Sequence, residues 1–247
     1  MKHLVFVSKD TGLTLSKILI ESFPDDDYTF VVFSNIKKSF LDFIVGKGYE
    51  YLDYSESAIE KIQNDNIQYD WLLNLWGGHI FSQTILDVAD KSLNIHPSFL
   101  PVARGSDPVV WTLRNGWKAG CSLHVITPEV DEGPIWIQKE ISYEMPITGG
   151  SLYKLVIEEC IKLFQFNWSD IRSGKIDASS QIKNNKTYYR RELLEDRLIN
   201  TDVDNNAWNI INKLLAHDFS PGYESQVIIN NKKFNAKLIL SEVNNDE

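Results

Sequence analysis

The amino-acid sequence predicts an α/β fold built on a doubly wound, mostly parallel sheet. Short apolar runs alternate with segments whose apolar residues recur every three to five positions, which is typical of strands alternating with helices. The runs are apolar almost throughout, as expected for strands covered by helices on both faces. With 247 residues, of which 43% are hydrophobic, the chain can bury a substantial core and forms at most two domains.

The predicted strands and helices follow one another in order along the chain. The predicted strands are short apolar runs, at residues 3–7, 28–33, 70–75 and 92–95. The predicted helices have apolar residues at helical spacing, at residues 13–23, 40–45, 82–88 and 151–168, and a further helix opens at 55–59. Ser55 is placed to cap that further helix. The longest helical pattern, 151–168, is expected to close the first domain.

The sequence changes character after Gly174. A polar break, a short helical pattern and two strand-like runs follow, at residues 183–186, 207–215, 226–229 and 234–240. Asn230 and Asn231 tolerate the positive φ of a tight turn, so the two runs are expected to form a β-hairpin. We therefore predict a catalytic domain over residues 1–180 and a small helix-and-hairpin subdomain over residues 181–247.

Composition and charge disfavour several classes of protein. The chain has 25 basic and 34 acidic residues and a net charge of −9, which repels the phosphate backbone of nucleic acids. No stretch approaches the ~20 apolar residues of a membrane span, and the N-terminal apolar run is too short for a signal peptide. Cys121 and Cys160 form no CxxC pair and are expected to be buried free thiols. We therefore expect a cytoplasmic protein that binds neither nucleic acid nor a membrane.

The most informative segment for chemistry is NIHPSFLP, at residues 94–101. Side chains alternate between the two faces of a strand, so Asn94 and His96 point to the same side. Pro97 cannot continue a central ladder, which puts His96 at the carboxyl end of its strand. Because open parallel sheets bind ligands at the carboxyl ends of their strands, we expect an amide and an imidazole to face one crevice.

A third candidate, Asp131, lies 35 residues after His96, in the segment VDEGPI that precedes another apolar run. Gly133 and Pro134 fix a turn behind it. If this loop folds back over the edge of the sheet, the carboxylate reaches His96. That contact is a hypothesis, because spacing alone does not determine it.

These residue types suit acyl transfer to an amine. Negative charge grows on the acyl oxygen during attack, and Asn94 and His96 can donate hydrogen bonds to it. The amine must lose a proton, which Asp131 can accept directly or through water. The chain has no GxSxG motif and no cysteine beside a histidine, so no side-chain nucleophile is predicted. His124 is interpreted as a structural histidine or as a second residue of the same crevice, and the other histidines show no metal-ligand spacing, so no metal is predicted.

Four separate blocks share one order and spacing with a known family. The blocks are NIHPSFLP at 94–101, RGSDPVVW at 104–111, GCSLH at 120–124 and DEGPI at 131–135. Together they resemble the formyltransferases that use 10-formyltetrahydrofolate and have a Rossmann-like sheet, strongly over about residues 70–145 and loosely before them. The resemblance implies that Asn94, His96 and Asp131 are catalytic. The family pattern Asp-Thr-Gly is DEG here, which keeps the catalytic position and changes the detail of the loop.

The resemblance also implies a site for 10-formyltetrahydrofolate as the formyl donor and cosubstrate. The segment WGGHIF at 76–81 aligns with the part of the family that lines the pterin pocket with backbone groups and apolar side chains. The predicted donor-binding residues are Trp76, Gly78, Ile80, Phe81 and Val130. A plain turn between a strand and a helix, which also needs glycines, is the alternative interpretation.

The acceptor side resembles the nucleotide-sugar members of the family, which formylate amino sugars carried on dTDP or UDP. The glycine loop of the glycinamide ribonucleotide enzymes is absent after the first strand, and the short tail and negative charge disfavour a basic tRNA-binding domain. A diphosphate needs cations and a base needs a flat ring. The predicted substrate-binding residues are Lys9, Arg104, Tyr188, Arg190 and Tyr223. The residues at 188–191, taken singly, also fit a solvated strand.

Other functions stay open on the sequence. The same three residues could formylate methionyl-tRNA or glycinamide ribonucleotide, or could hydrolyse the folate and release formate. A non-catalytic module that binds nucleotide or folate is a further alternative. For the nucleotide-sugar enzymes, the implied product is an N-formyl sugar for surface polysaccharides such as lipopolysaccharide O-antigen. By analogy with the family, the tail hairpin is expected to pair across a two-fold axis in a homodimer.

Overall fold

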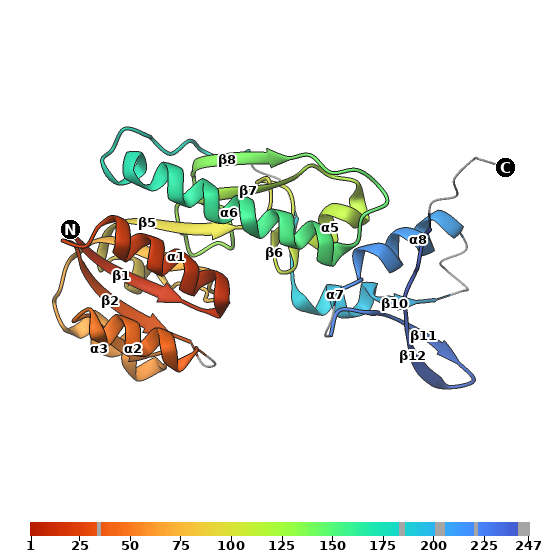
Figure 1. Ribbon diagram of the computed structural model, residues 1–247, viewed down its shortest axis with the longest axis horizontal. Helices are drawn as coiled ribbons and strands as arrows, with labels where there is room; N and C mark the ends of the chain where they lie inside the picture. Colours follow the sequence, from red (N-terminus) through yellow and green to blue (C-terminus); the bar gives the residue numbers. More distant parts are fainter. Residues whose placement is uncertain (34–35, 183–185, 201–205, 220–221, 242–247) are drawn as a thin grey trace.

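The computed structural model of the protein describes residues 1–33, 36–182, 186–200, 206–219 and 222–241. Within them, the centre is a seven-stranded sheet in the order β3-β2-β1-β4-β5-β7-β8, with helices packed against it (Figure 1). The strands are β1 (Lys2–Val7), β2 (Asp27–Val32), β3 (Glu50–Asp53), β4 (Tyr69–Leu75), β5 (Ala89–His96), β7 (Ala119–His124) and β8 (Ile135–Ile141). The first five of these are parallel, and β7 and β8 are antiparallel to their neighbours. The predicted α/β fold with a mostly parallel sheet is confirmed.

Helices cover both faces of this sheet. They are α1 (Lys9–Ser22), α2 (Lys38–Gly46), α3 (Glu56–Asn64), α4 (Gln83–Leu86), α5 (Pro108–Asn115) and α6 (Gly149–Arg172). The larger core lies between the sheet and α1, α2, α5 and α6, and it contains Val5 and Val7 of β1. The smaller core lies toward α3 and α4 and contains Leu4 and Phe6. Alternate residues of one strand thus face opposite helix layers, which explains the unbroken apolar sequence of the strand.

Most predicted elements are present, and the differences have physical reasons. Ser55 caps α3 as predicted, because its hydroxyl accepts a hydrogen bond from the Ala58 amide at 3.1 Å. The sequence does not predict β3, since this edge strand is largely exposed and only Leu52 is half-buried. The strand predicted at 234–240 is shorter in the structure and ends at Ala236, where its pairing with the neighbouring strand stops.

The order of the strands reverses between β1 and β4. β2 and β3 lie on one side of β1, whereas β4 and β5 lie on the other. The chain continues from β1 into α1 on the larger core and from β4 toward α4 on the smaller core. The two connections therefore diverge at the carboxyl ends of these strands, which is where open α/β sheets bind ligands.

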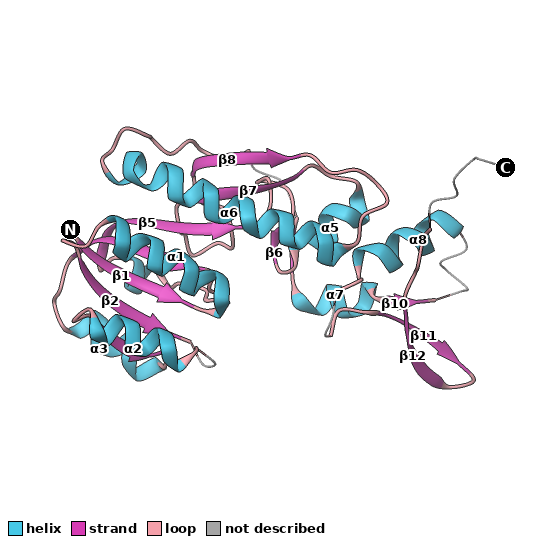
Figure 2. Ribbon diagram, viewed as in Figure 1, coloured by secondary structure: helices cyan, strands magenta, loops and turns pink. Residues whose placement is uncertain are grey.

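The chain after α6 forms a smaller unit beside the main sheet (Figure 2). It contains α7 (Arg190–Asp196), β10 (Leu198–Ile199), α8 (Ala207–Ala216) and a hairpin of β11 (Ser225–Ile229) and β12 (Lys232–Ala236). The hairpin turn has Asn230 at φ 48° and Asn231 at φ 60°, as predicted. A short strand pair, β6 (Arg104–Gly105) with β9 (Thr187–Tyr188), ties this unit to the main domain. In the described part of the chain, no helix has the length and apolar character needed to cross a membrane.

A partly buried network of charges attaches the C-terminal unit to α5. Asp196 accepts hydrogen bonds from Nε and Nη2 of Arg114, at 2.8 and 3.0 Å, and from Nε2 of His217 at 2.8 Å. His217 is fully buried, and its Nδ1 donates to the Tyr223 carbonyl at 3.2 Å. Burial alone would raise the pKa of Asp196, but the bonds from His217 and Arg114 lower it to about 2.

Replacing Asp196 with asparagine is expected to weaken this attachment in a pH-dependent way. The pKa of Asp196 is lower in the folded state than its ordinary value of 3.8, so its contribution is present above that value and is lost as the pH falls toward 2. Asp196→Asn should lower the free energy of unfolding by about 3 kcal/mol at pH 7. The difference from the wild type should shrink between pH 5 and pH 2, which urea unfolding at several pH values measures.

The matched control for this prediction is Asp170→Asn. Asp170 is 48% exposed and pairs with Lys175, so its loss should change the free energy of unfolding by less than about 1 kcal/mol. A difference between Asp196→Asn and the wild type that stays constant from pH 5 to pH 2 would contradict the assigned charge network.

Candidate active site

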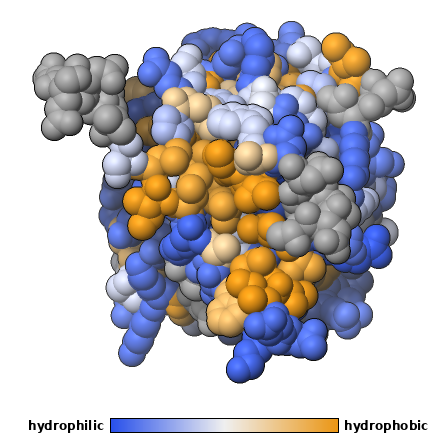
Figure 3. Space-filling view, turned by 90° about the vertical axis from the view of Figure 1, so that its right-hand side faces the viewer, coloured by the Kyte–Doolittle hydropathy of each residue, from blue (hydrophilic) through white to orange (hydrophobic). Residues whose placement is uncertain are grey.

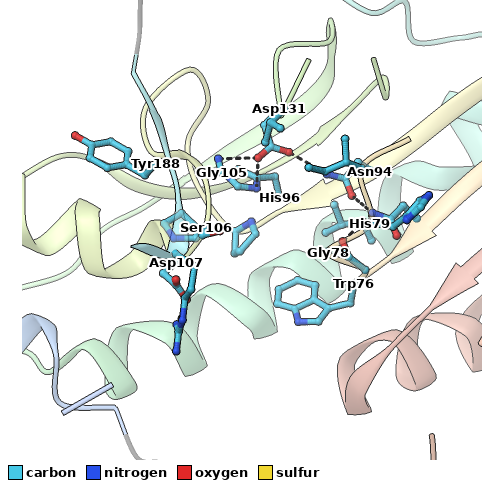
Figure 4. A pocket seen from close by; sticks show the side chains of 18 of the residues that line it. Trp76, Gly78, His79, Asn94, His96, Gly105, Ser106, Asp107, Asp131 and Tyr188 are labelled. Atoms are coloured by element: carbon cyan, nitrogen blue, oxygen red, sulfur yellow. Dashed lines mark hydrogen bonds and ion pairs between the residues drawn. The ribbon is translucent and has the colours of Figure 1, made fainter. Parts of the chain in front are cut away.

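A cavity of about 550 Å³ lies at the carboxyl ends of β1, β4 and β5 (Figure 4). Its walls come from segments far apart in the sequence, at Lys9, 76–80, 94–97, 105–108, 130–131, 188–190 and Tyr223. Small-molecule sites in proteins have volumes of about 300 to 1,000 Å³. The predicted crevice is therefore present, at the switch in strand order, and the C-terminal unit contributes to its walls.

The structure brings Asn94, His96 and Asp131 together. His96 is the last residue of β5 and is 5% exposed, and its Nδ1 lies 3.3 Å from Oδ2 of Asp131. Nδ2 of Asn94 lies 3.3 Å from Oδ1 of the same carboxylate. The loop between β7 and β8 thus folds back over the end of β5. This is the contact that spacing alone does not determine.

The hydrogen bonds of His96 determine which ring nitrogen carries its proton. Nε2 lies 3.0 Å from the carbonyl oxygen of Ala103, which can only accept, so Nε2 carries hydrogen. Burial lowers the pKa of His96, although the charge of Asp131 opposes that shift. A neutral His96 therefore turns the lone pair of Nδ1 toward Asp131. These two acceptors, 3.3 Å apart, can share one incoming proton.

Asp131 is held as a carboxylate by the groups around it. Burial alone would raise its pKa, but His96 and His124, when they are protonated, and the amide of Gly105 lower it well below its ordinary value. The Gly105 amide donates to Oδ2 at 2.8 Å. Nε2 of Gln181 donates to the backbone carbonyl of Asp131 at 3.0 Å and so holds the loop in place. Asp131 is therefore a fixed, ionised acceptor at pH 7.

The amide of Asn94 already has partners inside the protein. Its Oδ1 accepts from Nδ2 of Asn74 at 2.9 Å. Its Nδ2 lies 3.0 Å from Nε2 of His124 and 3.3 Å from Asp131, and His124 is an acceptor there because its Nδ1 donates to a backbone carbonyl. The N–H groups of Asn94 and His96, which are predicted to donate to the acyl oxygen, thus each have an acceptor inside the protein. The longer bond, from Asn94 to Asp131, is the one that a ligand oxygen can replace.

Sequence reasoning missed several residues that organise the site. Asn74 pairs with Asn94 in register, and its position as a lone polar side chain at the end of an apolar strand is a signal that could have identified it. The amide of Gly105 and the side chain of Gln181 carry no such signal. His124 is both buried, at 2% exposed, and part of the site, so the two interpretations of it are not exclusive.

Residues with strained backbone gather around the cavity. Apart from asparagines, the described non-glycine residues with positive φ are Lys9, Trp76, Ala103, Asp107 and Asp131. Four of these line the cavity, and Ala103 holds His96. Each left-handed residue costs about 1 kcal/mol or more and persists only where its surroundings enforce it. Their concentration here marks the cavity as the functional region.

The residues predicted to bind the formyl donor lie at one side of the cavity. Trp76, Gly78, Ile80 and Val130 line it, and Phe81 lines an adjoining cavity of about 50 Å³ together with Ile80 and Val130. The polar lining of the smaller cavity includes Asn74, Asn94 and His124. Apolar walls with a few convergent polar groups fit a flat heterocycle, so the residues present suit the pterin of a folate.

Four of the residues predicted to bind substrate line the other side of the cavity, and one does not. The four are Lys9, Tyr188, Arg190 and Tyr223. The Tyr188 ring is stacked on Trp111 with centroids 4.3 Å apart, so one of its faces is covered. Arg104 is 2% exposed, bonds to Gln181 at 2.8 Å and pairs with Glu132 at 3.3 Å. The prediction for Arg104 is therefore corrected, because its guanidinium holds protein loops and does not line the cavity.

The cysteines lie in the core and not in the cavity. Cys121 of β7 and Cys160 of α6 are buried free thiols, as predicted. Burial raises the pKa of Cys160, which disfavours its thiolate. In the residues that the structure describes, no group of three or more histidine, cysteine, aspartate or glutamate side chains is arranged to hold a metal ion.

Comparison with known proteins relates this site to a family. Residues 55–163, which include Asn94, His96 and Asp131, match the family model described as formyl transferase. A methionyl-tRNA formyltransferase from Thermotoga maritima is 34% identical over 147 residues, covering 59% of this chain and 46% of that protein. A dTDP-4-amino-4,6-dideoxyglucose formyltransferase from Mycobacterium tuberculosis is 26% identical over 168 residues, covering 67% and 70%. The chain thus spans about half the length of the first relative.

Solved structures share the fold over nearly the whole chain. A 4-N formyltransferase from Francisella tularensis has a TM-score of 0.83 at 24% identity and covers 98% of both chains. An N-formyltransferase from Helicobacter canadensis, solved with folinic acid and dTDP-3-aminofucose, has a TM-score of 0.72 at 18% identity and covers 94% of this chain and 86% of that one. At these identities the likeness establishes the fold.

Proposed function

Because residues 55–163 carry a formyl transferase domain, we propose that the protein transfers a formyl group from 10-formyltetrahydrofolate to the amine of an amino sugar carried on dTDP or UDP. The observation that carries this proposal is the convergence of Asn94, His96 and Asp131 on one cavity within that domain. The product would be an N-formyl sugar for surface polysaccharides such as lipopolysaccharide O-antigen. Free cysteines favour the cytoplasm as the place of reaction.

The proposed chemistry needs a proton acceptor and a donor to the developing oxyanion. The amine nitrogen bonds to the formyl carbon, the bond from that carbon to N10 of the folate breaks, and N10 leaves with the proton that the amine gives up. The His96–Asp131 pair accepts this proton at Nδ1 and returns it to N10, acting first as base and then as acid. Asn94 moves one N–H from Asp131 to the formyl oxygen and stabilises its charge.

We assign the folate to the side of the cavity formed by 76–81 and Val130. The smaller cavity offers apolar walls at Ile80 and Phe81 and polar groups at Asn74, which suits a ring with hydrogen-bonding edges. The Helicobacter protein of the same fold is solved with folinic acid, which supports a folate in this fold.

We assign the nucleotide sugar to the side formed by Lys9 and the C-terminal unit. Lys9 and Arg190 supply positive charge there for a diphosphate. A neighbouring cavity of about 230 Å³ is lined by the rings of Tyr153, Phe219 and Tyr223, which suit a base. The dTDP-3-aminofucose in the Helicobacter structure supports a nucleotide sugar as the acceptor.

The test is a transfer assay with 10-formyltetrahydrofolate and a panel of amines. The panel contains dTDP- and UDP-linked amino sugars, glycinamide ribonucleotide and methionyl-tRNA, and mass spectrometry detects the new formamide. Formylation of an amino sugar supports the proposal. Formylation of one of the other two amines, formate release without any formamide, or folate binding without turnover would each replace it with a different function.

We further propose that the C-terminal unit, within residues 181–247, pairs two copies of the chain. Its exposed apolar surface includes Ile228, Ile229 and Phe234 of the hairpin and Ile239 and Leu240 after it, which are 48% to 89% exposed. Apolar side chains gather on the side of the molecule that carries this unit (Figure 3). β12 is the edge strand of its sheet, so its outer backbone groups have no partner strand within the described sheet. A two-fold axis would cover this surface with its own copy.

A charge on this surface is expected to separate the two copies. Phe234→Glu should raise the dimer dissociation constant by about 100-fold or more, because it buries an unpaired carboxylate in the interface. Phe166→Glu is the matched control, since Phe166 is 73% exposed but lies on α6. Sedimentation equilibrium measures both variants. A monomeric wild type, or a Phe234→Glu variant that dimerises like Phe166→Glu, would rule this interface out.

A further inference from the structure

Asp107 does not act as a helix cap, although it directly precedes α5. Aspartate at such a position usually accepts hydrogen bonds from the first helical amides. Asp107 makes no capping bond and has left-handed backbone with φ 59°. Its side chain is 11% exposed and turns toward the C-terminal unit. The contacts made there must offset both the strained backbone and the missing cap.

These contacts join Asp107 to one arginine and one tyrosine of the C-terminal unit. Oδ1 accepts hydrogen bonds from Nη1 of Arg190 at 3.0 Å and from the hydroxyl of Tyr223 at 2.6 Å. The guanidinium of Arg190 lies over the Tyr223 ring, 4.4 Å from its centroid. Burial, together with the bond to Asp107, raises the pKa of Tyr223 to about 12, so its hydroxyl stays protonated and donates. Asp107 therefore holds Arg190 over the Tyr223 ring at the edge of the cavity.

The second carboxylate oxygen of Asp107 has no partner. Oδ2 is buried and makes no hydrogen bond in the structure. Buried polar atoms are nearly always bonded, so this exception needs a cause. Oδ1 alone is sufficient to anchor Arg190 and Tyr223. Asp107 lines the described cavity together with Lys9 and with its own partner Arg190, so its carboxylate belongs to the part of the wall that carries positive charge.

We propose that Asp107 is the positioning residue of a diphosphate site. Its carboxylate fixes the position of Arg190 before the anion binds. The same negative charge lowers the affinity of the site for the diphosphate. The inference rests on the proposed function for the nature of the anion. Arginine has five N–H groups, and Asp107 binds through one of its nitrogens, so donors remain for phosphate oxygens. The carboxylate also repels the incoming diphosphate at short range. The site is thus selective for a group with enough negative charge to outweigh Asp107.

The two roles of Asp107 can be separated by substitution. Asp107→Asn keeps an oxygen that can accept from Arg190 and Tyr223 and removes only the charge. Asp107→Ala removes the charge and also the anchor of Arg190. Asp170→Asn, which removes one charge near the far end of α6, controls for the net charge of the protein.

Isothermal titration of the full chain with inorganic pyrophosphate, dTDP and thymidine tests the proposal. Asp107→Asn should bind pyrophosphate and dTDP about 10-fold more tightly than the wild type does, because one repulsive charge is gone. Asp107→Ala should bind them several-fold more weakly than Asp107→Asn, because Arg190 is no longer preset. Thymidine, which has no phosphate, should bind all variants alike, and Asp170→Asn should match the wild type.

Binding of pyrophosphate to Asp107→Asn that is no tighter than to the wild type overturns the proposal. Equal binding by Asp107→Asn and Asp107→Ala overturns the positioning role. These outcomes are independent of the proposed reaction, because pyrophosphate contains neither sugar nor amine. Failure of formyl transfer to every amino sugar would reject the proposed function and leave the pyrophosphate result unchanged.

Discussion

Replacing His96 with asparagine is expected to lower kcat for formyl transfer by about 1,000-fold while the fold stays intact. The amide of asparagine lies where Nδ1 of His96 faces Asp131, and it gives up only the bond from Nε2 to the Ala103 carbonyl, which is 3.0 Å long in the wild type. It cannot take up a proton at the place where Nδ1 faces Asp131, and acid–base groups contribute about 100- to 10,000-fold to rate. KM for both substrates should change little, because binding uses other walls of the cavity.

The control for this substitution is His3→Asn. His3 is also a fully buried histidine bound to an aspartate, with Nε2 3.0 Å from Asp26, but it lies in β1 at the amino end of the sheet. Steady-state kinetics and thermal unfolding of both variants separate lost chemistry from lost stability. If His96→Asn keeps a rate close to that of the wild type, or if His3→Asn loses turnover to the same degree, the assigned role is wrong.

The parts of the fold that could be predicted from the sequence are those whose residues are buried on both sides. β1, β2 and β4 are buried at nearly every position and largely apolar, because helices cover both faces of the sheet. β3 lies at the edge and has a mostly polar sequence, so no periodicity reveals it. β6 and β9 are two residues long and are defined by their pairing, which no local pattern encodes.

The site, like the fold, has parts that could be predicted from the sequence and parts that could not. The shared direction of Asn94 and His96 follows from strand geometry, whereas the approach of Asp131 depends on the path of a loop that Gln181 holds from a distant segment. For Arg104 the error is the opposite one, because a residue predicted to bind substrate bonds to the protein instead. A cation beside a predicted site could face ligand or protein, and only the fold determines that this guanidinium bonds to Gln181 inside the protein.

The pairing of β6 with β9 makes Gly105 one of the least replaceable residues of the chain. Its φ is +87°, and a Cβ added there would lie 2.1 Å from the carbonyl oxygen of Tyr188. Its amide also donates to Asp131 at 2.8 Å. Gly105→Ala must therefore push β9 away from β6 or rotate this amide off the carboxylate. We expect a loss of about 3 kcal/mol in the free energy of unfolding and a fall in kcat of about 100-fold, because Asp131 loses a donor.

Gly116→Ala separates the contact from the backbone strain. Gly116 also has positive φ, +63°, but no atom lies within 4 Å of the position its Cβ would take. Its replacement should cost only about 1 kcal/mol, from the left-handed backbone alone. Urea unfolding should show that Gly105→Ala lowers the free energy of unfolding by about 2 kcal/mol more than Gly116→Ala does. This difference comes from the contact between the added Cβ and β9. Were the two alanine variants equally stable, the β6–β9 pair could not be what holds Tyr188 and the start of the C-terminal unit against the site.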